Sequence, residues 1–136
     1  MISPLHRSFT DAVAVLQTFV EQQANIEVVQ AISDRLTEAF NQNKKAVICG
    51  NGGSACDAMH FAEEFTGRYR MNRRPLPVIS LTDSSHITCV ANDYGFDHIF
   101  SRGVEAYGQE GDLLFALSTS GNSSNIIEAE IGRAHV

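Results

Sequence analysis

The chain has 136 residues, of which 43% are hydrophobic and 19% charged, a composition that favours one compact domain over a disordered segment. Its formal net charge of −6 excludes a general basic surface for nucleic acid or an anionic membrane. No apolar run approaches the length of a membrane span, and the N-terminus lacks a signal-peptide pattern. Three cysteines without a CxxC pair complete the expectation of a reduced, cytoplasmic protein.

Two amphipathic helices are predicted before Lys44, because apolar residues recur there at helical spacing. In the first segment these residues are Phe9, Val13, Leu16 and Val20. In the second they are Val29, Ile32, Leu36 and Phe40.

Three short apolar runs follow, at residues 46–49, 77–81 and 112–117, and each ends in polar turn residues. Helix-compatible stretches separate them, one reaching about Phe65 and another at residues 99–107. Strands that alternate with helices predict an α/β fold with a doubly wound parallel sheet.

Small polar turns follow the first and third runs, Gly50-Asn51-Gly52-Gly53-Ser54 and residues 118–123. Glycine lets the backbone approach a ligand, and the N-terminus of the next helix presents N–H groups that bind an oxyanion. In a parallel sheet such turns share the carboxyl edge, where ligands bind. Because serine and asparagine are also ordinary helix caps, each turn by itself is equally typical of a capped helix start. The two together, with the serines and threonine of the second, favour a phosphate site.

Two other phosphate motifs match poorly. Residues 50–55 fit the loose dinucleotide pattern G-x-G-x-x-A, but no acidic residue ends a second strand at the expected spacing, since Asp83 comes too late. A nucleoside-triphosphate loop requires a lysine that neither turn contains.

His60 and Glu64 are spaced i, i+4 after the first turn, with Asp57 on the same side of the expected helix. Ala58, Phe61, Ala62 and Phe65 are expected to form the opposite, apolar face. The pair suits half of a metal site, and a carboxylate near a bound sugar can act as a general base. A solvated helix face with a weak ion pair is the alternative that spacing alone favours.

Residues 49–69, 91–96 and 117–123 closely resemble phosphoheptose isomerases of the sugar isomerase (SIS) family in motif order and spacing. The resemblance implies a flavodoxin-like SIS fold, zinc, and a homotetramer with sites between subunits. It also implies interconversion of sedoheptulose 7-phosphate and D-glycero-D-manno-heptose 7-phosphate for the heptose of surface polysaccharides.

The resemblance assigns roles by position. His60 and Glu64 become zinc ligands, and Glu64 also becomes the catalytic base that moves a proton through an enediolate. The residues that contact the sugar are Asn51, Gly52, Gly53, Glu64, Asn92 and Asp93. Those that hold the phosphate are Ser118, Thr119, Ser120 and Ser123.

The end of the chain departs from the family, which continues with two more strands and a long helix carrying a glutamine and a histidine. We therefore expect residues 1–129 to be an incomplete SIS domain, residues 130–136 to be a non-native tail, and the fragment to be inactive by itself. Two alternatives to the isomerase remain: a non-catalytic SIS adaptor that binds a phosphosugar or a replication initiator, and a dinucleotide-binding domain. The His60 and Glu64 pair disfavours the first, and the serine-rich turn disfavours the second.

Overall fold

The computed structural model describes residues 3–132, and the chain divides into two units between Thr37 and Glu38. Residues 133–136, part of the expected tail, lie outside the described residues, and residues 130–132 end the last helix. That the tail is non-native stays a prediction. The elements are α1 Pro4–Glu21, α2 Gln23–Asn41, β1 Ala46–Gly50, α3 Gly53–Thr66, β2 Val78–Ser80, α4 Ser84–Asp93, the 3-10 turn η1 Phe96–His98, α5 Ser101–Tyr107, β3 Leu113–Leu117 and α6 Ser124–Gly132.

Both N-terminal helices predicted from the apolar spacing are confirmed. α1 starts at Ser3, whose hydroxyl accepts a hydrogen bond from the His6 N–H at 3.1 Å, and Pro4 occupies the first turn, where no N–H donor is needed. The apolar positions of α1 are nevertheless exposed: Phe9 is 67% and Leu16 64% accessible. α1 thus carries an exposed apolar stripe.

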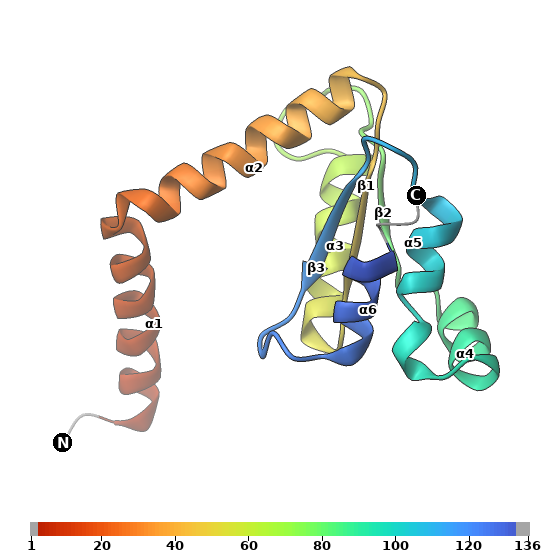
Figure 1. Ribbon diagram of the computed structural model, residues 1–136. Coiled ribbons are helices and arrows are strands. Elements are labelled where there is room, and N and C mark those ends of the chain that lie inside the picture. Colours follow the sequence, from red (N-terminus) through yellow and green to blue (C-terminus); the bar gives the residue numbers. More distant parts are fainter. Residues whose placement is uncertain (1–2, 133–136) are drawn as a thin grey trace. The chain divides into compact units, whose positions relative to one another are not determined.

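The sheet has three parallel strands in the order β2-β1-β3 (Figure 1). β1 is central and buried along its whole length. In the register, Ala46 lies opposite Val78 on one side and Leu113 on the other, and Gly50 lies opposite Leu117. The three predicted strands and their parallel arrangement are therefore confirmed, and the carboxyl ends of β1 and β3 lie side by side.

Helices cover both faces of the sheet, which confirms the doubly wound arrangement. On one face Val47 and Cys49 of β1 pack with residues of α4, α5 and α6, including Val90, Val104 and Ile126. On the other face α3 covers the strands, with the rings of Phe61 and Phe115 5.3 Å apart between centroids. A buried central strand that reads as a continuous apolar run is the normal consequence of this architecture.

Cys49 illustrates how fully this core is closed. Its side chain is completely inaccessible, and burial, with a smaller contribution from the negative charge of Glu130, raises its pKa to about 12. It is therefore a neutral core residue, whereas Cys56 and Cys89 are exposed free thiols.

α4 is the helix that sequence periodicity did not predict. Its apolar stripe is short, with Ile87, Val90 and Ala91 against the core, and most of its other residues are polar or β-branched, with weak helix propensity. The signal that identifies it is Asp83, whose carboxylate accepts a hydrogen bond from the His86 N–H at 2.8 Å as an N-cap. The hydrogen bonds to Ser85 and His86 also lower the pKa of Asp83 below its usual range.

An ion pair closes the opposite, amino edge of the sheet. Asp112 pairs with the ammonium group of Lys45, accepts the Lys45 backbone N–H at 2.9 Å and accepts the Gln109 N–H at 2.9 Å. Burial opposes ionisation of Asp112, but the hydrogen bonds and charge of Lys45 outweigh it and hold the carboxyl pKa below its usual value. The pair thereby fastens the start of β1 to the start of β3.

Among the described residues, no helix is both long enough and apolar enough to span a bilayer.

Candidate functional site

The conformation of the first glycine turn requires glycine at two positions, Gly50 and Gly52. A Cβ at Gly50 would lie 2.7 Å from Cβ of Ser54, so only glycine lets β1 run this close to the first turn of α3. Gly52 has φ +53° and ψ −120°, a conformation that side chains oppose. Gly53 faces open space, since a Cβ added there would meet nothing within 4 Å. A ligand can therefore approach the backbone at the start of α3.

The second turn gathers serine hydroxyls at the start of α6. Ser118 Oγ accepts a hydrogen bond from the Gly121 N–H at 3.0 Å and lies 3.4 Å from Ser123 Oγ. Ser120 Oγ lies 3.5 Å from Ser118 Oγ and accepts the Asn122 N–H at 3.2 Å. Gly121, with φ +68°, permits the reversal of the chain. Thr119 is exposed beside them.

The two turns lie at the same edge of the sheet and are joined by a pair of side chains. Asn51 of the first turn donates to Asn125 Oδ1 of α6 at 2.8 Å, and Asn125 donates to Asn51 Oδ1 at 2.9 Å. The structure thus brings the glycine turn and the serine turn together, as the parallel sheet predicted.

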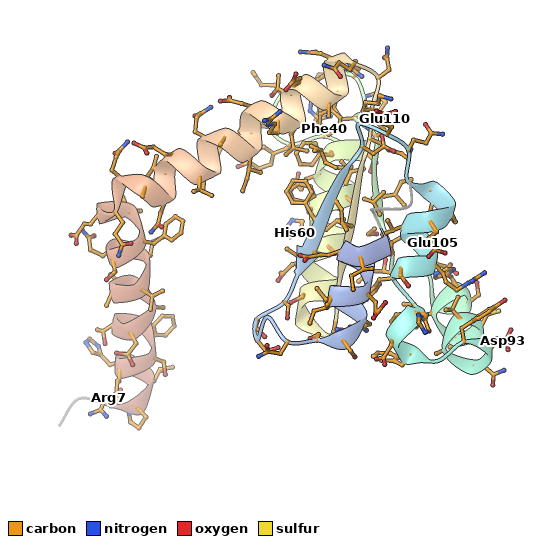
Figure 2. The ribbon with its side chains drawn as sticks, viewed as in Figure 1. Arg7, Phe40, His60, Asp93, Glu105 and Glu110 are labelled. Atoms are coloured by element: carbon orange, nitrogen blue, oxygen red, sulfur yellow. The ribbon has the colours of Figure 1, made fainter. Side chains whose placement is uncertain are left out.

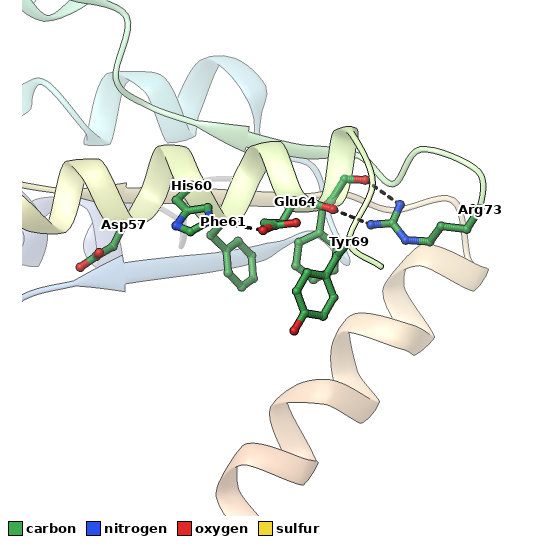
Figure 3. Close-up of a pocket in the computed structure, with 7 residues that line it drawn as sticks. Asp57, His60, Phe61, Glu64, Tyr69 and Arg73 are labelled. Carbon is green, nitrogen blue, oxygen red and sulfur yellow. Dashed lines mark hydrogen bonds and ion pairs between the residues drawn. The ribbon is translucent and has the colours of Figure 1, made fainter. Parts of the chain in front are cut away.

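His60 and Glu64 face a cavity on α3, where Nε2 of the histidine lies 3.3 Å from Oε1 of the glutamate (Figure 3). Glu63 Oε1 is 3.7 Å from the same nitrogen, and the candidate donor atoms of all three residues lie within 4.8 Å of one another. An imidazole with carboxylates is a donor set that zinc accepts. The residues present therefore fit a metal ion at this place.

The cavity has a volume of about 530 Å³ and an aromatic wall. Its lining residues are Asp57, His60, Phe61, Glu64, Phe65, Tyr69 and Arg73. The guanidinium of Arg73 donates to the carbonyl oxygens of Glu64 at 2.6 Å and Phe65 at 2.8 Å, which fixes the end of α3. Since Asp57 lines the cavity with His60, its expected side of the helix is confirmed.

The expected apolar face of α3 is confirmed, and its two rings reach further than expected. Ala58 and Ala62 are buried against the sheet. Phe61 packs against Phe115 of β3 and Phe65 against Phe40, and both rings also line the cavity beside His60 and Glu64. Their large rings span from the sheet to the cavity, which helical spacing alone does not show. Tyr69 and Arg73 were missed because residues 67–74 carry no periodic pattern.

Asn92 and Asp93 lie at the end of α4, away from this cavity; Figure 2 shows the labelled Asp93 far from the labelled His60. Asn92 Nδ2 donates to Asp93 Oδ1 at 2.7 Å, and Cys89 donates weakly to Asp93 Oδ2 at 3.7 Å. In the described part of the chain, no side-chain hydrogen bond joins either residue to the two turns. One chain by itself does not unite all the residues assigned to the site.

Comparison with known proteins places these features in a family. The SIS domain family matches residues 8–134. A phosphoheptose isomerase from Fusobacterium nucleatum is 57% identical over 122 residues, covering 90% of this chain and 63% of the relative. A phosphoheptose isomerase from Vibrio cholerae is 54% identical over 130 residues, covering 95% of this chain and 68% of the relative. The chain thus spans close to two thirds of the length of these relatives.

The solved structures agree with the sequence comparison. A phosphoheptose isomerase from Neisseria gonorrhoeae superposes with a TM-score of 0.87 at 38% identity, covering 96% of this chain and 68% of that one. A phosphoheptose isomerase from Francisella tularensis superposes with a TM-score of 0.75 at 34% identity, covering 94% and 70%. The chain therefore belongs to the SIS domain family, among the relatives named phosphoheptose isomerase.

Proposed function

We propose that the protein is an aldose–ketose isomerase that interconverts sedoheptulose 7-phosphate and D-glycero-D-manno-heptose 7-phosphate for heptose biosynthesis in the cytoplasm. The observation that carries the proposal is the placement of His60 and Glu64 on the helix that starts at the glycine turn. At 1.5 Å per residue, His60 lies about 10 Å along α3 from Gly53. Because the serine turn lies at the same edge of the sheet as Gly53, this separation suits a ligand that is held by its phosphate at that edge and has its reacting carbon further along α3.

The serine turn is the proposed phosphate site. Its hydroxyl groups, from Ser118, Thr119, Ser120 and Ser123, act together with the N-terminal N–H groups of α6 as donors without net charge. The neighbouring glycine turn, with Asn51, Gly52 and Gly53, lines the sugar through exposed backbone. Asn92 and Asp93 are the remaining proposed sugar contacts.

Glu64 is the proposed general base. Its carboxylate takes a proton from C1 of the ketose, which gives an enediolate, and then delivers a proton to C2. The proton of the C1 hydroxyl group passes to the former carbonyl oxygen in the same reaction, which gives the aldose. His60 Nε2, 3.3 Å from Oε1, orients this carboxylate. Zinc, held by His60 and Glu64, supplies positive charge for the developing oxyanion when it is bound.

A homotetramer with sites between subunits is part of the proposal. Two observations support it: the exposed apolar stripe of α1, including Val13 at 67% accessibility, and the separation of Asp93 from the His60 cavity within one chain. Apolar stripes of this kind mark interaction surfaces, and a second copy of the chain would complete a shared site.

Thermal denaturation with ligands tests the substrate class. We expect sedoheptulose 7-phosphate to stabilise the protein by about 2.7 kcal/mol at 100 times its Kd, and sedoheptulose without phosphate to have far less effect. Ser118→Ala with Ser120→Ala should abolish the shift, whereas Ser8→Ala, in the exposed first helix, should retain it. Stabilisation by NAD and not by the sugar phosphate would identify a dinucleotide-binding domain instead.

A further inference from the structure

The Asn51–Asn125 pair joins two segments that lie 74 residues apart in the sequence. Each side-chain amide donates one hydrogen bond and accepts the other, at 2.8 and 2.9 Å. Asn125 is only 2% accessible, whereas Asn51 is partly exposed. The pair therefore lies beneath the site and connects the glycine turn to the first turn of α6.

Local structure does not explain an asparagine at position 125. It is the second residue of α6 and is followed by buried Ile126, so an apolar side chain would suit the core. A buried amide without a partner costs free energy, and in this chain the cost is offset by the two bonds to Asn51. The stabilising contact of Asn125 is thus with the glycine turn.

The contact matters because the backbone hydrogen bonds of the glycine turn run to α3, from Ser54 N–H to the Asn51 carbonyl at 2.9 Å and from Ala55 N–H to the Gly52 carbonyl at 3.0 Å. The Asn51 side chain is what ties the turn to α6. Gly52 and Gly53 have no side chains, and a Cβ at either position would meet nothing within 4 Å. Glycine has the largest backbone freedom of any residue, so this turn samples many conformations unless it is held. Asn51 is the residue of the turn whose side chain is fixed, through its two hydrogen bonds to Asn125.

We propose that Asn125 is a positioning residue that sets the glycine turn at a fixed distance from the serine turn, so that one sugar phosphate contacts both. This inference rests on the proposed phosphosugar site and deepens it. It also gives Asn51 a different part in that site, because its amide bonds to Asn125 and only the backbone of its turn faces the ligand. Preorganising the turn removes an ordering cost that binding would otherwise carry.

NMR of the labelled chain tests the proposal in two stages. In the ligand-free protein, Asn125→Ala should increase the backbone mobility of Gly52 and Gly53 while leaving that of Gly121 little changed. On titration with sedoheptulose 7-phosphate, the wild-type amides of both turns should shift with one Kd. In Asn125→Ala the amides of the serine turn should still respond, with Kd raised about tenfold, and those of the glycine turn should not.

Asn51→Ala provides a second variant, since it removes the same pair from the partly exposed side and tests the idea even if Asn125→Ala fails to fold. The double variant should bind no more weakly than either single variant, because both remove one interaction. Asn41→Ala, exposed at the end of α2, should bind as the wild type does.

The results of these titrations distinguish failure of the positioning role of Asn125 from failure of the proposed phosphosugar site. An unchanged Kd at both turns in the variants, or additive losses in the double variant, would overturn the positioning role alone. Absence of any shift in the wild type would overturn the phosphosugar site, and the positioning role with it.

Discussion

Glu64→Gln is expected to lower kcat for heptose phosphate isomerisation by about 10² to 10⁴-fold, the usual contribution of a positioned general base. Glutamine keeps the size and one acceptor oxygen of the side chain, but it cannot take up the proton. The loss should therefore fall mainly on kcat and not on KM. Because the matched relatives extend beyond this chain, the kinetics are measured on a protein of their full length that contains this sequence.

Glu105→Gln is the matched control for this variant. Glu105 is exposed on α5 and lies outside the cavity, so the same chemical change should leave kcat unaltered. Retention of wild-type kcat by Glu64→Gln would mean that another group transfers the proton.

Asp112→Ala is expected to lower the free energy of unfolding by about 3–5 kcal/mol. Asp112 has a side chain only 7% accessible, and its partner Lys45 is 19% accessible. The substitution leaves the ammonium group of Lys45 without its partner in a largely enclosed place, and it removes the acceptors of two backbone N–H groups. Urea denaturation measures the loss.

Glu110→Ala is the control: this residue lies two positions earlier and is exposed, so its substitution should change the free energy of unfolding by less than about 0.5 kcal/mol.

The contribution of Asp112 to the free energy of unfolding should also depend on pH. Its pKa is lower in the folded state than in the unfolded state, so its contribution is full above the unfolded value of about 3.9 and is lost as pH falls through the folded value. A deficit for Asp112→Ala that stays unchanged as the pH is lowered until wild-type Asp112 is protonated would show that packing, and not the ion pair, carries the effect.

Much of the fold could be predicted because the strands are short apolar runs that end in glycine or serine. Burial on both faces requires continuous apolar residues in β1, and this pattern is visible at Val47 and Ile48 without any structure. α4 was not found by the same means, since its apolar stripe is limited to Ile87, Val90 and Ala91 among polar residues. Its capping residue, Asp83, is a better signal than its helical face.

The site was predictable where it depends on local spacing and not where it depends on distant contacts. Helical geometry was sufficient to bring His60 within 3.3 Å of Glu64. The same geometry placed Phe61 on the face that packs against the sheet, where its ring meets Phe115, but it did not show that the ring also lines the cavity. Asn125 could not be identified at all, since its partner is 74 residues away. The catalytic and metal-binding roles came from the resemblance and remain predictions.

Turnover of sedoheptulose 7-phosphate in D₂O, followed by NMR of the product, tests whether the protein isomerises this sugar phosphate by proton transfer. We expect an aldose heptose 7-phosphate with deuterium at C2, because Glu64, with a side chain 31% accessible, exchanges the transferred proton with solvent. A product without deuterium would show that the transferred proton does not exchange with solvent at Glu64, and no product from a protein of the family's full length would contradict the proposed isomerase function.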